Sequence, residues 1–135
     1  MNAILKNILA VIAGILVGSI VNMGLIMLGL TVISPPAGVD MMDAESLKSN
    51  IHLFEFRHFI SPFLAHALGT LAGAYVAARI AVTHQMKFAL GIGVCFFLGG
   101  VMMVMDMPSP MWFNVLDLVG AYVPMAWIGW KLSSN

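Results

Sequence analysis

Four long apolar stretches, with the few charged residues gathered at their ends, constrain this chain more than any other feature. They cover residues 8–33, 61–83, 86–105 and 112–132. Each is long enough to cross a membrane as a helix, which takes roughly 20 residues for a ~30 Å hydrocarbon core. Hydrophobic residues make up 61% of the chain and charged residues 9%, so these helices have no polar face to present to water. We therefore predict an all-α, membrane-embedded four-helix bundle that forms a single domain over residues 1–135.

The positive charges are unequally divided between the two sides of this predicted bundle. Four of the six (Lys6, Arg79, Lys87 and Lys131) lie on the side shared by the N-terminus, the second loop and the C-terminus. The positive-inside rule then places both termini in the cytoplasm of a multi-pass inner-membrane protein. We expect the first stretch to be a retained helix and not a signal peptide, because its apolar run is long and no A-x-A-like site follows. Nothing in this charge pattern indicates nucleic-acid binding.

The loop between the first two stretches, residues 34–60, is the largest segment predicted to lie outside the membrane. Asp43 can cap a short amphipathic helix in this first extracytoplasmic loop, with apolar residues at Ala44, Leu47, Ile51 and Phe54. We expect this helix to lie along the outer interface, with Phe54, Phe56 and Phe59 directed inward. An irregular aromatic cap on the bundle is the alternative. Ser61 is expected to be the N-cap of the second span, with Pro62 at its first helical position.

Small residues recur at four-residue spacing within three of the four stretches. We predict helix-packing positions at Gly14, Gly18, Gly69, Gly73, Gly91 and Gly99. Helices in lipid gain nothing by burying apolar surface against one another, so small residues that permit close backbone approach mark their contact faces. A tight bundle explains these stripes. A stripe left unused within one chain would favour a homodimer or a membrane-protein partner.

Polar residues inside the apolar stretches are expensive, so they mark the most informative positions for function. His66 and Asp117 each lie five residues into a helix that runs inward from the outer face, which puts both roughly 7–8 Å below that face. We predict that the two side chains contact each other directly or through one water. The full candidate cluster is His66, Asp117, Asn114, Asn22 and Tyr122. Pro124 also leaves the carbonyl of Gly120 without its helical partner.

Two classes of function account for this cluster. Interhelical hydrogen bonds in lipid stabilise by about 0.6–2 kcal/mol, so the polar residues can simply hold helices together. We accordingly favour a structural or accessory membrane protein that acts through helix packing. The alternative is a transporter or binding protein for a proton, an ion or a small solute, which uses the same residues as a polar track. We expect no enzymatic activity and no cofactor, because no nucleophile–base pair or phosphate-binding loop is present.

Twelve methionines add a further alternative, copper handling at the outer face. Thioethers and imidazoles are the soft ligands that suit Cu(I). The weak candidates are His58, Met103 and Met107. Methionine is also a routine filler of apolar helices, and no regularly spaced ligand set is visible, so the sequence alone predicts no metal site.

Three motifs resemble those of a group of small bacterial four-span membrane proteins. They are the Pro35-Pro36-Ala37-Gly38-Val39-Asp40 run, the His66-Ala67-Leu68-Gly69-Thr70-Leu71-Ala72-Gly73 run, and the Pro108-Ser109-Pro110-Met111-Trp112-Phe113 run. The resemblance covers nearly the whole chain and implies the four-span architecture and a bacterial inner membrane. It implies no particular activity. The Phe-Glu-Phe-Arg-His segment before the second span departs from the less charged approach that the group leads us to expect.

Overall fold

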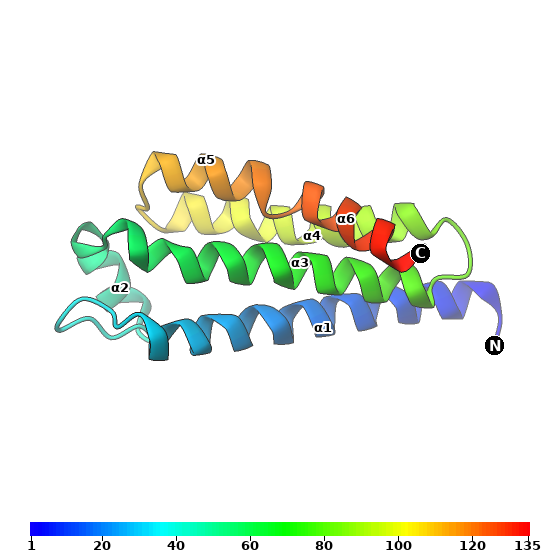
Figure 1. Ribbon diagram of the computed structural model, residues 1–135, viewed down its shortest axis with the longest axis horizontal. Coiled ribbons are helices and arrows are strands. Elements are labelled where there is room, and N and C mark those ends of the chain that lie inside the picture. Colours follow the sequence, from blue (N-terminus) through cyan, green and yellow to red (C-terminus); the bar gives the residue numbers. More distant parts are fainter.

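The computed structural model describes all 135 residues and is all-helical, as predicted. Four segments are long and apolar enough to cross a membrane: Ala3–Val32, Phe56–Ile80, Gln85–Asp106 and Met111–Ser133. The individual elements are α1 (Ala3–Val32), α2 (Ala44–Asn50), η1 (Ile51–Leu53), η2 (Phe56–Phe59), α3 (Ile60–Ile80), α4 (Gln85–Asp106), α5 (Met111–Gly120) and α6 (Val123–Ser133). The four long segments lie side by side as a bundle (Figure 1).

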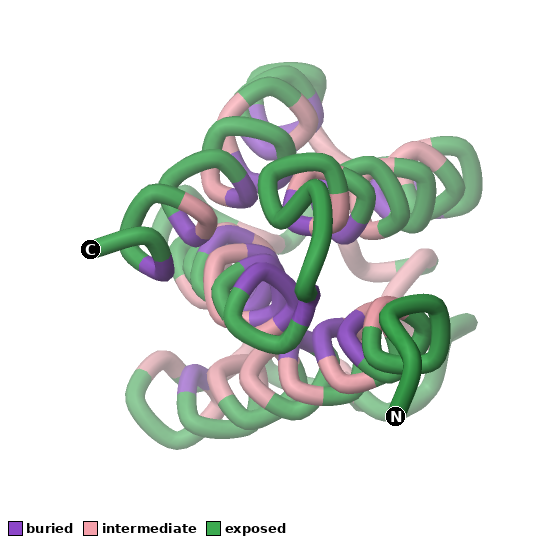
Figure 2. The backbone as a smooth tube through the Cα atoms, turned by 90° about the vertical axis from the view of Figure 1, so that its right-hand side faces the viewer, coloured by how far each residue is buried: buried purple, intermediate pink, exposed green.

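Helix α3 is the centre of this bundle. It packs on α1 along one side and on α4 and α6 along the other (Figures 1 and 2). Its buried face is made of small residues: Ala65, Ala67, Gly69, Thr70, Gly73, Ala74, Ala77 and Ala78. Both chain termini lie at one end of the bundle, called here the terminal end, and α2 lies at the other, called here the α2 end (Figure 1).

Glycines bring α1 and α3 together at backbone distance. A Cβ atom added to Gly14 would lie 2.8 Å from the carbonyl oxygen of Gly73, and one added to Gly69 would lie 2.9 Å from that of Gly18. Real side chains do not tolerate such distances to backbone atoms. The predicted packing roles of these four glycines are therefore confirmed.

The predicted packing stripe on α4 is wrong. Gly91 and Gly99 are exposed, and a Cβ atom added to either would meet no atom within 4 Å, whereas Gly93 packs against Ala126 and Gly100 against Tyr122. Helix α4 is thus rotated so that a neighbouring row of glycines meets α6. Gly93 and Gly100 are seven residues apart, about two helical turns, and phenylalanines occupy the four-residue positions between them (Phe96 and Phe97), so a search for small residues at four-residue spacing does not find this face.

The fourth span is two helices and not one. Helix α5 ends at Gly120 with Ala121 as its cap, Tyr122 leaves the helical path, and α6 begins at Val123 with Pro124 in its first turn. We predicted that Pro124 leaves the Gly120 carbonyl without its helical donor. In the structure the helix is interrupted just before Pro124. The Ala121 amide still donates to Asp117 at 2.9 Å, and the Ala126 amide donates to Tyr122 at 2.9 Å, so each half-helix retains its terminal bonds.

The first loop differs from its prediction in two details. Asp43 caps α2 as expected, accepting a bond from the Glu45 amide at 3.2 Å. The helix is only seven residues long, and its apolar continuation packs over the bundle: Phe59 is buried, while Phe56 stays exposed and stacks on Trp112. Ser61 is not the N-cap of α3, because η2 leads directly into Ile60.

Candidate functional site

His66 and Asp117 form the centre of the site. His66 lies on α3 and Asp117 on α5, and Nδ1 of the imidazole lies 2.8 Å from Oδ1 and 3.0 Å from Oδ2 of the carboxylate. The Asp117 side chain is 5% exposed and the His66 side chain 19% exposed, so the pair is largely shielded from its surroundings. The contact predicted from equal depth in the membrane is therefore present and direct.

Tyr122 completes the hydrogen bonding of Asp117. Its hydroxyl donates to Oδ2 at 3.0 Å, and its ring stacks on the His66 ring with centroids 5.8 Å apart. The break between α5 and α6 makes this possible, because Tyr122 leaves the helical path and its side chain reaches back along α5. A continuous helix would carry residues 117 and 122 on different faces, since five residues turn through about 500°. Pro124 is the sequence signal that could have indicated the break.

Asn114 lies outside this group, although it belongs to the predicted cluster. Its amide donates to the carbonyl of Ser109 at 3.3 Å, and it is buried one turn before Asp117. The bond ties the start of α5 to the preceding loop. Asn114 thus helps to position the helix that carries Asp117.

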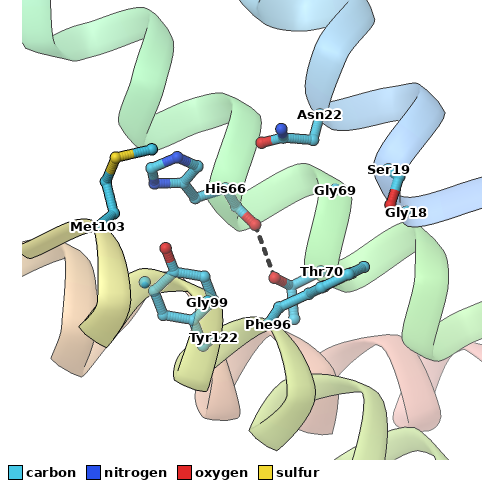
Figure 3. A pocket seen from close by; sticks show the side chains of 11 residues that line it. Gly18, Ser19, Asn22, His66, Gly69, Thr70, Phe96, Gly99, Met103 and Tyr122 are labelled. Atoms are coloured by element: carbon cyan, nitrogen blue, oxygen red, sulfur yellow. Dashed lines mark hydrogen bonds between the residues drawn. The ribbon is translucent and has the colours of Figure 1, made fainter. Parts of the chain in front are cut away.

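A cavity of about 250 Å³ lies beside the pair, between α1, α3 and α4. Its lining residues are Gly18, Ser19, Asn22, His66, Gly69, Thr70, Phe96, Gly99, Gly100, Met103 and Tyr122. Figure 3 shows Asn22 of α1 directed toward the His66 ring of α3, with Met103 of α4 beside that ring. Asn22 and Tyr122, two members of the predicted cluster, both line this cavity. Ser19 and Gly99 are exposed, so the cavity reaches the surface between α1 and α4.

A second cavity, of about 320 Å³, lies toward the α2 end and shares His66 and Met103 with the first. It is bounded by α1, the first loop, α3 and the end of α4, and it is mostly apolar. Met103 and Met107, two of the weak metal candidates, both line it. We call it the methionine chamber.

His58 is not available as a metal ligand, although it also lines the methionine chamber. Its Nδ1 accepts from the Glu55 amide at 2.8 Å and its Nε2 lies 3.1 Å from the carbonyl of Ser34. Both ring nitrogens are thus used to hold the first loop together. No group of three or more His, Cys, Asp or Glu side chains is placed to hold a metal.

The geometry fixes which nitrogen of His66 is free. A carboxylate accepts hydrogen bonds, so Nδ1 carries the proton that is shared with Asp117. Nε2 has no hydrogen-bond partner in the chain, and in the neutral ring it keeps a lone pair. A carboxylate that orients one ring nitrogen and leaves the other as acceptor or ligand is the arrangement found behind metal-binding histidines. His66 can therefore accept a proton, accept a hydrogen bond or bind a soft cation.

No protein-family model, curated protein or solved structure matches this chain. The resemblance to small four-span proteins of bacteria stays a prediction.

Proposed function

We propose that this protein binds a small polar ligand or an ion inside the membrane, in the cavity between α1, α3 and α4. The observation that carries this proposal is Nε2 of His66, a nitrogen without a protein partner on a ring that lines an open cavity. The membrane is proposed to be a bacterial inner membrane, with both termini in the cytoplasm and the α2 end on the outer face. Residues that only hold helices together need no such cavity.

The polar groups around the cavity support binding. The Asp117 carboxylate is satisfied by His66 and Tyr122, so it holds the ring in place without itself lining the cavity. Ser19 and Asn22 supply further hydrogen-bonding groups from α1, and neither side chain has a hydrogen-bond partner within the chain. Binding sites in membrane proteins combine an apolar wall with a few convergent polar groups of this kind.

Cysteine labelling tests the proposal. Ser19→Cys lines the cavity, and Ile20→Cys is its matched control because Ile20 is the next residue of α1 and is 69% exposed on the lipid-facing side. Both are made in a Cys95→Ser background and treated with a small water-soluble thiosulfonate. We expect Ser19→Cys to react and Ile20→Cys to stay unmodified. Equal protection of the two cysteines would show a cavity closed to water and would contradict the proposal.

A structural role through helix contacts is the second candidate. The observation that favours it is the exposed row of Gly91, Cys95 and Gly99 on α4, which meets no other helix of the chain. A second copy of the chain placed on this row would bring two Cys95 thiols close together. Mild oxidation of membranes should then yield a disulfide-linked dimer that Cys95→Ser abolishes. A wild-type protein that stays monomeric under oxidation would rule out this contact.

A further inference from the structure

Six methionines line the methionine chamber, and four of them form two pairs at helical spacing. Met23 and Met27 line it from α1. Met103 lines it from α4, and Met107 from the position directly after α4, where its amide still donates to the Met103 carbonyl at 2.8 Å. Residues four apart lie on the same helix face one turn from each other, so each pair presents two thioethers to the same space. Met41 and Met42 add two more from the first loop.

The chamber is also lined by His66, the residue with the free nitrogen of the functional site. His66 lines both cavities, and so does Met103, whose thioether lies beside the His66 ring in Figure 3. Thioether and imidazole together are soft ligands that select Cu(I) over hard cations such as Mg²⁺ and Ca²⁺. We propose that the methionine chamber binds one Cu(I) ion, with His66 Nε2 and the thioethers of Met103 and Met107 as the first ligands. This proposal depends on the proposed function, because it uses the same His66 ring and its free Nε2, and His66 lines both cavities.

The electrostatics of the site suit a monovalent cation. His66 transmits the negative charge of Asp117 to the ion through the hydrogen bond at Nδ1. One carboxylate and one Cu(I) ion are together neutral, which matters because an uncompensated charge within a membrane is costly. The remaining lining offers no competing charge, since the only other ionisable side chain is His58, whose two nitrogens are already bonded.

Packing alone is the competing explanation, because methionine fills irregular apolar gaps. Six of the 17 residues around the chamber are methionine, against 12 of 135 in the chain, so the concentration in this one place needs a cause. A Met→Leu change conserves volume and apolar character but removes the sulfur. It therefore separates the two explanations.

The experiment measures Cu(I) affinity of the purified full-length protein in detergent, without oxygen and with ascorbate, by competition with the chromophoric chelator bicinchoninate. The test variants are Met103→Leu and Met107→Leu. The controls are Met102→Leu and Met105→Leu, which lie at the same end of α4 and line neither cavity. We expect one Cu(I) per wild-type chain, a loss of affinity of about tenfold or more in both test variants, and no change in the controls.

Two outcomes would overturn the inference: wild-type protein that retains no Cu(I), or control variants that lose affinity as much as the test variants. Thermal unfolding of each variant checks that it is folded. If Met103→Leu or Met107→Leu does not fold, Met27→Leu on α1 takes its place as the test variant. If Ser19→Cys is labelled but no Cu(I) is retained, only the copper inference fails. If Ser19→Cys is also protected, the proposed function fails with it.

Discussion

Asp117 is the residue around which the polar site is organised. It accepts hydrogen bonds from His66 of α3 and from Tyr122 beyond the end of α5, and almost none of its surface is exposed. A buried carboxylate with one donor removed keeps its desolvation cost and loses part of the compensation. The three side chains should therefore behave as a coupled unit in which single changes are more harmful than paired ones.

The first prediction concerns the His66–Asp117 pair. His66→Ala should destabilise the protein by roughly 3–5 kcal/mol, because the Asp117 carboxylate stays buried with only Tyr122 as donor. The double variant with Asp117→Ala should be more stable than His66→Ala alone. A double-mutant cycle, measured as thermal stability in a mild detergent, gives the coupling. Simple additivity of the two changes would contradict it.

The second prediction concerns the Tyr122 hydroxyl. Tyr122→Phe removes one hydrogen bond to Asp117 and leaves the ring in place, so it should cost about 1.5–3 kcal/mol, the usual range for a bond to a charged group. Tyr75→Phe is the matched control, since Tyr75 is 38% exposed and its hydroxyl makes no hydrogen bond within the chain. Thermal unfolding of both variants, measured under the same conditions, gives the loss of stability in each. An equal loss of stability in the two variants would show that the hydrogen bond to Asp117 contributes nothing to the stability of the protein.

At the level of the helices, two features build the site. The glycines of α1 and α3 permit backbone contact, which brings Asn22 close to the His66 helix: a Cβ on Gly69 would lie 3.0 Å from that of Asn22. The break between α5 and α6 frees Tyr122 to bond Asp117. Close packing and a broken helix are both tolerated in a membrane where neighbouring groups satisfy the backbone.

The third prediction tests the glycine contact. A Cβ on Gly73 would lie 2.5 Å from the carbonyl oxygen of Gly14, so Gly73→Leu should separate α1 from α3 and prevent stable folding. Gly24→Leu is the control, because a Cβ atom added to Gly24 meets no atom within 4 Å. Gel filtration in mild detergent gives the fraction of folded protein. A Gly73→Leu protein that elutes like the Gly24→Leu control would refute the contact.

Across the whole molecule, polar contacts tie loops to helices at both ends of the bundle. At the terminal end, the Asn7 side chain of α1 bonds Thr83 at 2.7 Å and the Val82 amide at 3.0 Å. At the α2 end, the Lys48 amine of α2 pairs with Asp106 of α4 at 2.8 Å. The second contact joins the first loop, which lines the methionine chamber, to the end of α4.

The fourth prediction is a pH dependence of that contact. The hydrogen bond to Asp106 raises the pKa of the Lys48 amine above its ordinary value of 10.5. The contact is therefore fully present below the ordinary pKa and is lost as the pH rises through the raised one. Leu47→Cys lines the chamber and Ser49→Cys is exposed, so the ratio of their thiol-labelling rates, in a Cys95→Ser background, reports opening of the loop.

That labelling ratio should rise at high pH, and Asp106→Asn should raise it already at neutral pH. The effect should shrink in high salt, because the pair is solvent-exposed. If the labelling ratio is the same with Asp106 and with Asp106→Asn at every pH, the ion pair does not hold the loop.

The fifth prediction is the orientation of the bundle. Ser49→Cys in α2 should react with an impermeant thiol reagent added to intact cells, and Ser134→Cys should react only after the membrane is opened. The Lys and Arg distribution motivates this expectation, since four of six positive residues lie at the terminal end. Labelling of Ser134→Cys but not of Ser49→Cys in intact cells would reverse the orientation.

The sequence by itself determined the features that depend on position along a helix. Apolar length set the four spans, and residue count from the helix starts placed His66 and Asp117 at one depth, where the structure shows them bonded. The glycines of α1 and α3 were also identifiable, because four-residue spacing marks one face.

Only the tertiary structure decided how each helix is turned about its own axis. In water an apolar stripe points to the core, but a helix in lipid is apolar all round, so its pattern does not distinguish a protein-facing side from a lipid-facing one. This is why Gly93 and Gly100 pack, and not Gly91 and Gly99. For the same reason the sequence did not reveal the methionine chamber. Its two methionine pairs come from α1 and from the end of α4 with the residue after it, and they line one cavity only because of the way both helices are turned about their own axes.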